Sequence, residues 1–148
     1  MENNAKETVL SIRDLSITFK TGAGPVNAIR GVNIDLPRGT TLAVVGESGS
    51  GKSVTFKAAM GILASNSVVN SGSIVYNYRH NDGTPATVDI LTMKTRDIRR
   101  HINGKRIAMI FQDPMTSLDP TMPIGKQIME GMIWHYKTPK QQAWEKAV

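Results

Sequence analysis

The sequence contains no cysteine, few aromatic residues and no long hydrophobic run. Without cysteine the chain cannot form disulfides, thiolate zinc sites or a cysteine nucleophile, which fits a reducing compartment. No apolar run approaches the roughly 18 residues needed to cross a membrane. Residues 1–7 also lack the basic-then-apolar order of a signal peptide. We therefore expect the chain to work in the cytoplasm.

The charge balance is basic, with 18 lysines and arginines against 12 acidic residues and a net charge of +6. Such a balance is typical of proteins that bind nucleic acid, an anionic membrane surface or phosphate ligands. No aromatic residue that could stack on bases interrupts the densest basic stretch, which contains Arg96, Arg99, Arg100, Lys105 and Arg106. We therefore expect no nucleic-acid partner, and a solvated or membrane-facing basic surface.

Hydrophobic patterning predicts an α/β fold within a single domain of 148 residues. Alternating apolar residues at 9–19 and 32–36, joined by a Gly- and Pro-containing turn, predict two antiparallel strands. Continuous apolar runs at Leu42–Val45 and Ile107–Phe111 instead predict strands buried on both faces, as in a parallel sheet. Helical segments between these two runs complete the α/β pattern.

Other segments are assigned from periodicity, capping and turn residues. Residues 72–77 read as a short strand after a polar break at 66–72, and residues 79–87 as a surface hairpin or loop. Helices are predicted at 54–63, 95–102 and 124–136, and from Pro139 onward, where a capping-box pattern precedes the helix.

The segment from Gly46 to Ser53, G-E-S-G-S-G-K-S, has the spacing of a phosphate-binding loop. Glycines let successive backbone N–H groups turn toward phosphate oxygens, and the following helix adds the positive end of its dipole. Lys52 would reach the β- and γ-phosphates, and the Ser53 hydroxyl would bind Mg²⁺. At average composition one window matches by chance about once in thirty thousand. The alternative is a flexible Gly-Ser turn that binds no ligand.

A second motif, A-M-I-F-Q-D-P-M-T-S-L-D-P at 108–120, places Gln112 60 residues after Lys52. A side-chain amide can accept from water and donate to a phosphate oxygen, so Gln112 could orient an attacking water. Alternatively, the apolar run could be a Walker-B strand with Asp113 as the metal ligand. That pattern needs the acid directly after the run, whereas here Gln112 intervenes and Pro114 follows.

Together these motifs resemble those of ATP-binding cassette (ABC) proteins. The wording F-Q-D-P-M-T-S-L is most similar to ATPase subunits of bacterial peptide importers, in the oligopeptide, dipeptide and nickel group. The resemblance implies part of an ABC-type P-loop core: an antiparallel β layer at about 8–40, an α/β core at 41–113 that ends at the Q-loop, and the start of a helical subdomain at 114–148.

The resemblance also implies site residues, cofactors and partners. ATP and Mg²⁺ would be bound by Gly46, Ser48, Gly49, Ser50, Gly51, Lys52 and Ser53, with Lys52 and Gln112 catalytic and Gln112 near the metal. Phe19 would stack on adenine, although spacing alone favours a core role for it. The partners would be membrane-spanning permease subunits, a second ATPase subunit of the same or another kind and, indirectly, a solute-binding protein. The location would be the inner face of a bacterial cell membrane.

The 148 residues contain no L-S-G-G-Q signature, no recognisable Walker-B acid pair and no switch histidine. We therefore expect weak ATP binding and inefficient hydrolysis by this chain, because the γ-phosphate lacks an opposing clamp. We also expect the apolar runs at 42–45 and 107–111 to be left exposed and to promote self-association. Two other functions stay open: a soluble P-loop enzyme, such as a kinase or a non-transport ABC protein acting on nucleic acid, or an interaction fragment with a vestigial nucleotide site.

Overall fold

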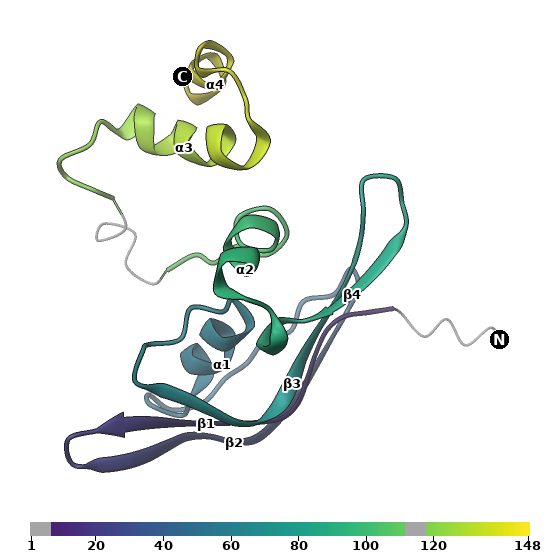
Figure 1. Cartoon of the computed structure of the whole chain (residues 1–148), viewed down its shortest axis with the longest axis vertical. Coiled ribbons are helices and arrows are strands. Elements are labelled where there is room, and N and C mark those ends of the chain that lie inside the picture. The colour runs from purple at the N-terminus through teal and green to yellow at the C-terminus, as the bar shows by residue number, and fades with distance from the viewer. Residues whose placement is uncertain (1–6, 112–117) are drawn as a thin grey trace. The chain divides into compact units, whose positions relative to one another are not determined.

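The computed structural model describes residues 7–111 and 118–148 (Figure 1). The chain divides into two compact units, one that ends at Thr95 and one that runs from Arg96 to Val148. The first unit carries the phosphate-loop motif, and the second carries the basic stretch and the C-terminal helices.

An antiparallel sheet of four strands, in the order β2-β1-β3-β4, forms the first unit. The strands are β1 (Thr8–Thr21), β2 (Gly24–Pro37), β3 (Ser67–Arg79) and β4 (Pro85–Asp89). The antiparallel layer predicted from the first two alternations is therefore confirmed, as is the hairpin that links β3 to β4. The predicted polar break at 66–72 is wrong, because these residues pair with β1: Ser67 lies opposite Phe19, and Asn70 Nδ2 donates to Thr18 Oγ1 at 2.7 Å.

A bulge in β1 is accommodated by a glycine on the neighbouring strand. The pairing of β1 with β3 shifts between Arg13 and Ser16, and Asp14 has a positive φ of 45°. A Cβ at Gly72 would lie 2.6 Å from both the Arg13 carbonyl oxygen and the Leu15 Cα. Only a residue without a side chain allows β3 to pass the bulge at this distance.

One face of the sheet is covered by α1 (Lys52–Ala59) and the short 3₁₀ helix η1 (Ile90–Thr92) (Figure 1). The helix is shorter than the predicted 54–63 because Gly61 adopts a left-handed φ of 62°. The Gly61 N–H donates to the Ala58 carbonyl, and the Ile62 N–H donates to the Lys57 carbonyl. These two hydrogen bonds form a Schellman motif, which ends the helix. The buried core is aliphatic, and its fully buried large side chains in this unit are Ile12, Leu15, Ile17, Ile74 and Ile90.

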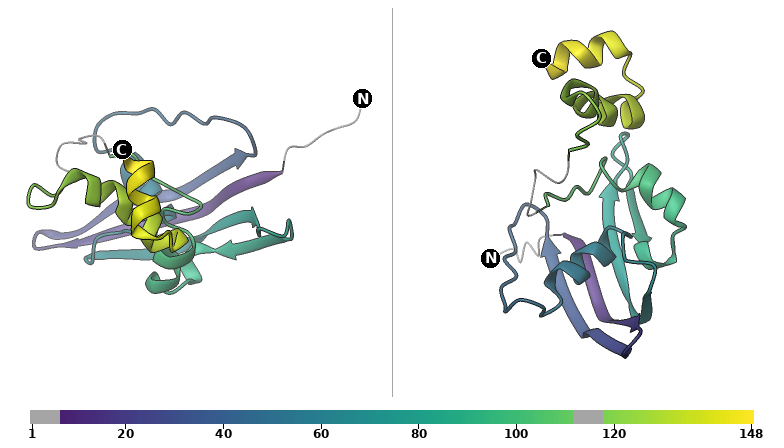
Figure 2. Two further views of the ribbon diagram at one scale, coloured as in Figure 1. Left: turned by 90° about the horizontal axis from the view of Figure 1, so that it is seen from above. Right: turned by 90° about the vertical axis from the view of Figure 1, so that its left-hand side faces the viewer.

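The parallel strands predicted at Leu42–Val45 and Ile107–Phe111 are not formed. Figure 2 shows the connection between β2 and α1 as irregular coil outside the sheet. Val45 is 89% exposed and Ile110 97% exposed. A strand needs neighbours that pair its backbone groups, and in the described part of the chain the sheet strands pair only with one another. The expected exposure of these apolar runs is thus confirmed.

The second unit contains α2, which begins at the boundary (Thr95–His101), α3 (Ile124–Tyr136) and α4 (Lys140–Ala147). α3 and α4 pack together: Ala143 is fully buried, and a Cβ at Gly125 would lie 2.9 Å from the Trp144 ring. The capping box expected before α4 does not form, because Pro139 is the N-cap and has no side chain able to accept from the first turn. Within the described ranges, no helix combines the length and apolarity that a membrane crossing requires.

Candidate functional site

The loop from Gly46 to Ser53 joins the irregular coil to α1. Its residues are exposed up to Ser50, and a turn is closed by the Ser50 N–H, which donates to the Glu47 carbonyl at 3.2 Å. Gly49 and Gly51 have left-handed φ values of 79° and 90°. Ser48, which precedes Gly49, is exposed in this turn. The predicted loop therefore exposes its backbone and turns where glycine is needed.

The Lys52 ammonium group lies inside the curve of this loop. Lys52 Nζ donates to the carbonyl oxygens of Gly46 and Glu47 at 2.7 Å each, and lies 3.1 Å from Ser50 Oγ. The side chain thus folds back from the first residue of α1 over the loop that precedes it. A cation held at this position suits the charge and the oxygen acceptors of a nucleotide phosphate.

Gly51 fixes the loop against the sheet of the same unit. A Cβ at this position would lie 2.5 Å from Ile29 Cδ1 and 2.8 Å from the Ala28 carbonyl oxygen. Ala28 is the extra residue where the pairing between β1 and β2 shifts, since Ile17 faces Ile29 and Thr18 faces Asn27. The loop therefore meets the sheet at a β-bulge, and the carbonyl group of the bulged residue lies next to Gly51.

The start of α1 offers anion-binding N–H groups and an exposed hydroxyl. The first turn contains no acidic residue, and the Gly51 carbonyl accepts from the N–H and the hydroxyl of buried Thr55. Ser53 is the second helical residue and is exposed. Its hydroxyl is therefore available as a Mg²⁺ ligand beside a phosphate, while water and phosphate oxygens would supply the other ligands. Among the described residues no cluster of three metal-ligating side chains occurs.

Phe19 lies in β1, half-buried, opposite Val26 of β2 and Ser67 of β3. Phe19 lies two residues after the fully buried Ile17, so both side chains are on the same face of β1. Ile17 is paired with Ile29 of β2, and the Ile29 side chain lies against Gly51 of the phosphate loop. At about 3.4 Å per residue, Val26 lies roughly 10 Å along β2 from Ile29. The sheet thus presents an aromatic ring on the face that carries the loop, and its stacking on adenine stays a prediction.

Gln112 and the rest of 112–117 lie outside the described residues. Immediately after them, a turn is held by Gln127 of α3, whose Nε2 donates to the carbonyls of Asp119 and Met122 at 2.8 Å. Asp119 Oδ1 accepts from the Thr121 N–H and hydroxyl, at 2.8 and 2.6 Å. The Thr121 hydroxyl holds the pKa of Asp119 below its ordinary value. Our sequence interpretation missed both this turn and Gln127; the D-P-T run is typical of an Asx-turn, but it does not indicate which residue holds the turn.

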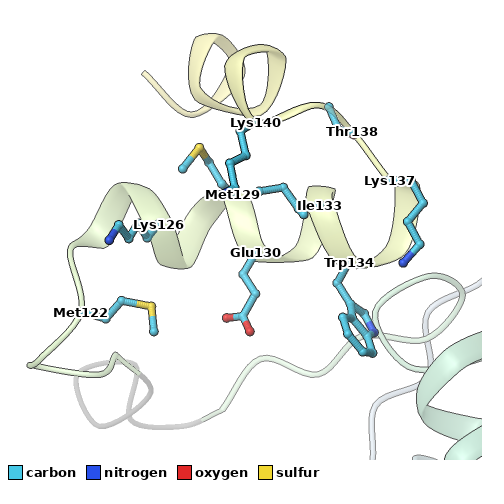
Figure 3. Close-up of a pocket in the computed structure, with 9 residues that line it drawn as sticks. All are labelled: Met122, Lys126, Met129, Glu130, Ile133, Trp134, Lys137, Thr138 and Lys140. Atoms are coloured by element: carbon cyan, nitrogen blue, oxygen red, sulfur yellow. The ribbon is translucent and has the colours of Figure 1, made fainter.

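A groove of about 650 Å³ lies along α3 and its connection to α4. Its lining combines apolar and charged residues: Met122, Lys126, Met129, Glu130, Ile133, Trp134, Lys137, Thr138 and Lys140. Figure 3 shows Met129 and Ile133 directed toward α4, whereas Glu130 and Trp134 are directed away from it. The groove therefore combines apolar side chains with three lysines and one glutamate.

Comparison with known proteins identifies the family. The pattern of the ABC transporter family matches residues 29–147. The dipeptide transport ATP-binding protein DppD of Lactococcus lactis is 49% identical over 133 residues, which are 90% of this chain and 35% of that protein. The oligopeptide transport ATP-binding proteins OppD of Bacillus subtilis and Escherichia coli are 45% and 41% identical, over 95% and 96% of this chain and 37% and 39% of their own lengths. The chain thus spans little more than a third of these relatives, and it belongs to the ABC transporter family.

Proposed function

We propose that the loop from Gly46 to Ser53 binds the phosphates of Mg²⁺-ATP. The observation that carries this proposal is the Lys52 ammonium group, which the loop holds 2.7 Å from two of its own carbonyl oxygens. Phosphate oxygens would replace these neutral acceptors with charged ones, and hydrogen bonds to charged groups are the stronger kind. Gly51 and β2 would keep the loop in place during this exchange.

Different residues of this chain would bind the phosphates, the metal ion and the base of the nucleotide. The backbone of Gly46, Ser48, Gly49 and Ser50 and the start of α1 would surround the phosphates, and Ser53 would hold the metal. The bound Mg²⁺ would supply positive charge that neutralises the β- and γ-phosphates. Phe19 would support the adenine ring, and Gln112 would orient water near the metal.

We further propose that this chain is the ATP-binding portion of the energy-coupling ATPase subunit of a bacterial peptide importer, located at the inner face of the cell membrane. The names of the similar proteins, which describe dipeptide and oligopeptide transport, support this proposal. Its partners would be membrane-spanning permease subunits and a second ATPase subunit. The groove on α3, which combines apolar residues with three lysines and Glu130, offers a surface for such a contact.

Thermal melting with Mg²⁺-ATP tests nucleotide binding. A ligand at 100 times its dissociation constant stabilises the folded state by about 2.7 kcal/mol, so a saturating concentration should raise the melting temperature clearly. Absence of any shift would favour a vestigial site. Co-purification of the chain with permease subunits tests the transport role.

The alternative enzymatic functions are separated by their products and ligands. Transfer of the γ-phosphate to an added small-molecule acceptor would indicate a kinase. Salt-sensitive binding of DNA or RNA would indicate a non-transport role on nucleic acid. We expect neither, and we expect the chain alone to bind ATP without efficient turnover.

A further inference from the structure

Most of the net charge of the chain is concentrated in a short segment of the second unit. Residues 96–106 contain five basic residues and one acidic residue, a net charge of +4. The whole chain, with 18 basic and 12 acidic residues, has a net charge of +6. The remaining 137 residues are therefore close to neutral in balance. We call the four exposed members, Arg96, Arg99, Arg100 and Lys105, the basic surface.

The fold of this segment separates charged from apolar side chains. Ile98 of α2 and Ile102, which directly follows the helix, are 4% and 1% exposed, so the apolar side chains of this segment are buried. Arg96, Arg99 and Arg100 are spaced three and four residues apart and share another face of the helix, which is exposed. After the helix the Arg106 N–H donates to the Ile102 carbonyl at 2.9 Å, a turn that keeps Lys105 near the end of α2.

The positive charge of this surface is poorly neutralised within the protein. Arg96 lies 4.0 Å from its own neighbour Asp97, with 87% of its side chain exposed. Within 7–111 and 118–148, Arg99, Arg100 and Lys105 have no carboxylate at ion-pair distance. Four solvated cations with one weak counter-charge attract an external anion.

We propose that the basic surface binds the anionic phospholipid head groups of a membrane. An acidic protein partner would need an apolar centre to its interface, and the isoleucines of this segment, Ile98 and Ile102, are buried. A single-stranded nucleic acid would be expected to use aromatic stacking, and 96–106 contains no aromatic residue. Lipid phosphates require only accessible charge, and guanidinium groups bind phosphate with two parallel hydrogen bonds. The inference deepens the proposed function, since it rests on the chain working beside a membrane.

The basic surface is expected to add to membrane binding as an auxiliary contact, one basic residue at a time. Each basic residue near an anionic membrane contributes a factor of roughly 5.4 to binding, so removal of two should weaken binding about thirtyfold. The test is sedimentation of the full 148-residue chain with vesicles of phosphatidylcholine mixed with phosphatidylglycerol, compared with vesicles of phosphatidylcholine alone. We expect binding only to the anionic vesicles, weakened by salt and about thirtyfold by Arg99→Gln with Arg100→Gln.

Matched variants distinguish binding by the basic surface from a general effect of the protein's net charge. Arg30→Gln with Lys146→Gln removes the same charge from exposed residues elsewhere and should reduce binding far less. Arg99→Lys with Arg100→Lys should retain most of it. Equal losses in the two Gln pairs, or tighter binding to an oligonucleotide or polyglutamate than to anionic vesicles, would overturn the inference. Mg²⁺-ATP binding measured on the same samples tests the proposed function separately, since Arg99 and Arg100 lie outside the phosphate loop.

Discussion

Gly51 lies so close to Ile29 that no side chain fits between the phosphate loop and β2. A Cβ on residue 51 would approach Ile29 Cδ1 to 2.5 Å and the Ala28 carbonyl oxygen to 2.8 Å. The last glycine of the loop therefore has two constraints, its left-handed φ of 90° and this contact. Gly49, with a φ of 79°, has only the first, because nothing lies within 4 Å of its Cβ position.

This difference predicts the effect of alanine at the two glycines. Gly49→Ala should cost about 1–2 kcal/mol of folding free energy from backbone strain alone. Gly51→Ala should cost at least about 1 kcal/mol more, because crowding against β2 adds to the strain. Urea denaturation of both variants measures the difference. Equal losses would show that the contact with Ile29 has no energetic weight.

Phe19 allows base recognition to be separated from phosphate binding. Phe19→Leu keeps an apolar side chain but loses the flat ring, so ATP should bind about fivefold more weakly, for a loss of roughly 1 kcal/mol of stacking. Inorganic tripolyphosphate, which has no base, should bind the variant and the wild type equally. Competition against a fluorescent nucleotide measures both. If the two ligands weaken together, Phe19 supports the fold of the site and does not stack on adenine.

Asp35 predicts a pH dependence of stability. Two hydrogen bonds from the Arg13 guanidinium, at 2.7 and 2.6 Å, lower the pKa of the Asp35 carboxyl group. A hydrogen bond from the Ser11 side chain lowers this pKa to a smaller extent. Because the folded-state pKa is below the unfolded value of about 4, this stabilisation is present at neutral pH and is lost as pH falls through the lowered pKa.

Asp35→Asn should therefore destabilise the protein near neutral pH and have a smaller effect near pH 3, roughly one unit below the unfolded value. Urea midpoints at the two pH values measure this. Glu145→Gln, on an exposed residue of α4, is the control and should change neither midpoint. A loss of stability for Asp35→Asn that is the same at both pH values would contradict the ion-pair explanation.

Ile110 tests whether the exposed apolar runs cause self-association. It is 97% exposed, and the residue belongs to no strand of the described sheet. Wild-type chain should self-associate with rising concentration in sedimentation velocity, and Ile110→Asp should shift the equilibrium toward monomer. Val148→Asp, at a residue 91% exposed, should have little effect. A wild-type chain that stays monomeric at high concentration would refute this explanation.

Patterns within short stretches of sequence correctly predicted β1, β2 and the phosphate loop. The alternation in β1 and β2 was visible because one face of that hairpin packs on a core, and the phosphate loop was visible because its glycine and lysine spacing is fixed by backbone geometry. The start of β3 was missed because Asn70 and its neighbours pair through polar side chains, which look like a loop in the sequence.

Contacts between distant segments could not be predicted in the same way. The strands expected at 42–45 and 107–111 were wrong because a hydrophobic run becomes a strand only when another strand pairs with it. Likewise, nothing in the sequence indicated that Gly51 meets the bulge at Ala28, or that the Gln127 side chain closes the turn at Asp119. The prediction for Gln112 lies outside the described residues and awaits a direct test.

The central claim is that Lys52 holds the phosphates of ATP, and calorimetric titration with Mg²⁺-ATP tests it most directly. Wild-type chain should bind, and Lys52→Ala should bind at least about tenfold more weakly, since a hydrogen bond to a charged group is worth about 1.5–3 kcal/mol. Lys57→Ala, which removes the same charge from the last turn of α1, should bind like the wild type. Equal affinities for wild type and Lys52→Ala, or no binding by the wild type, would contradict the account.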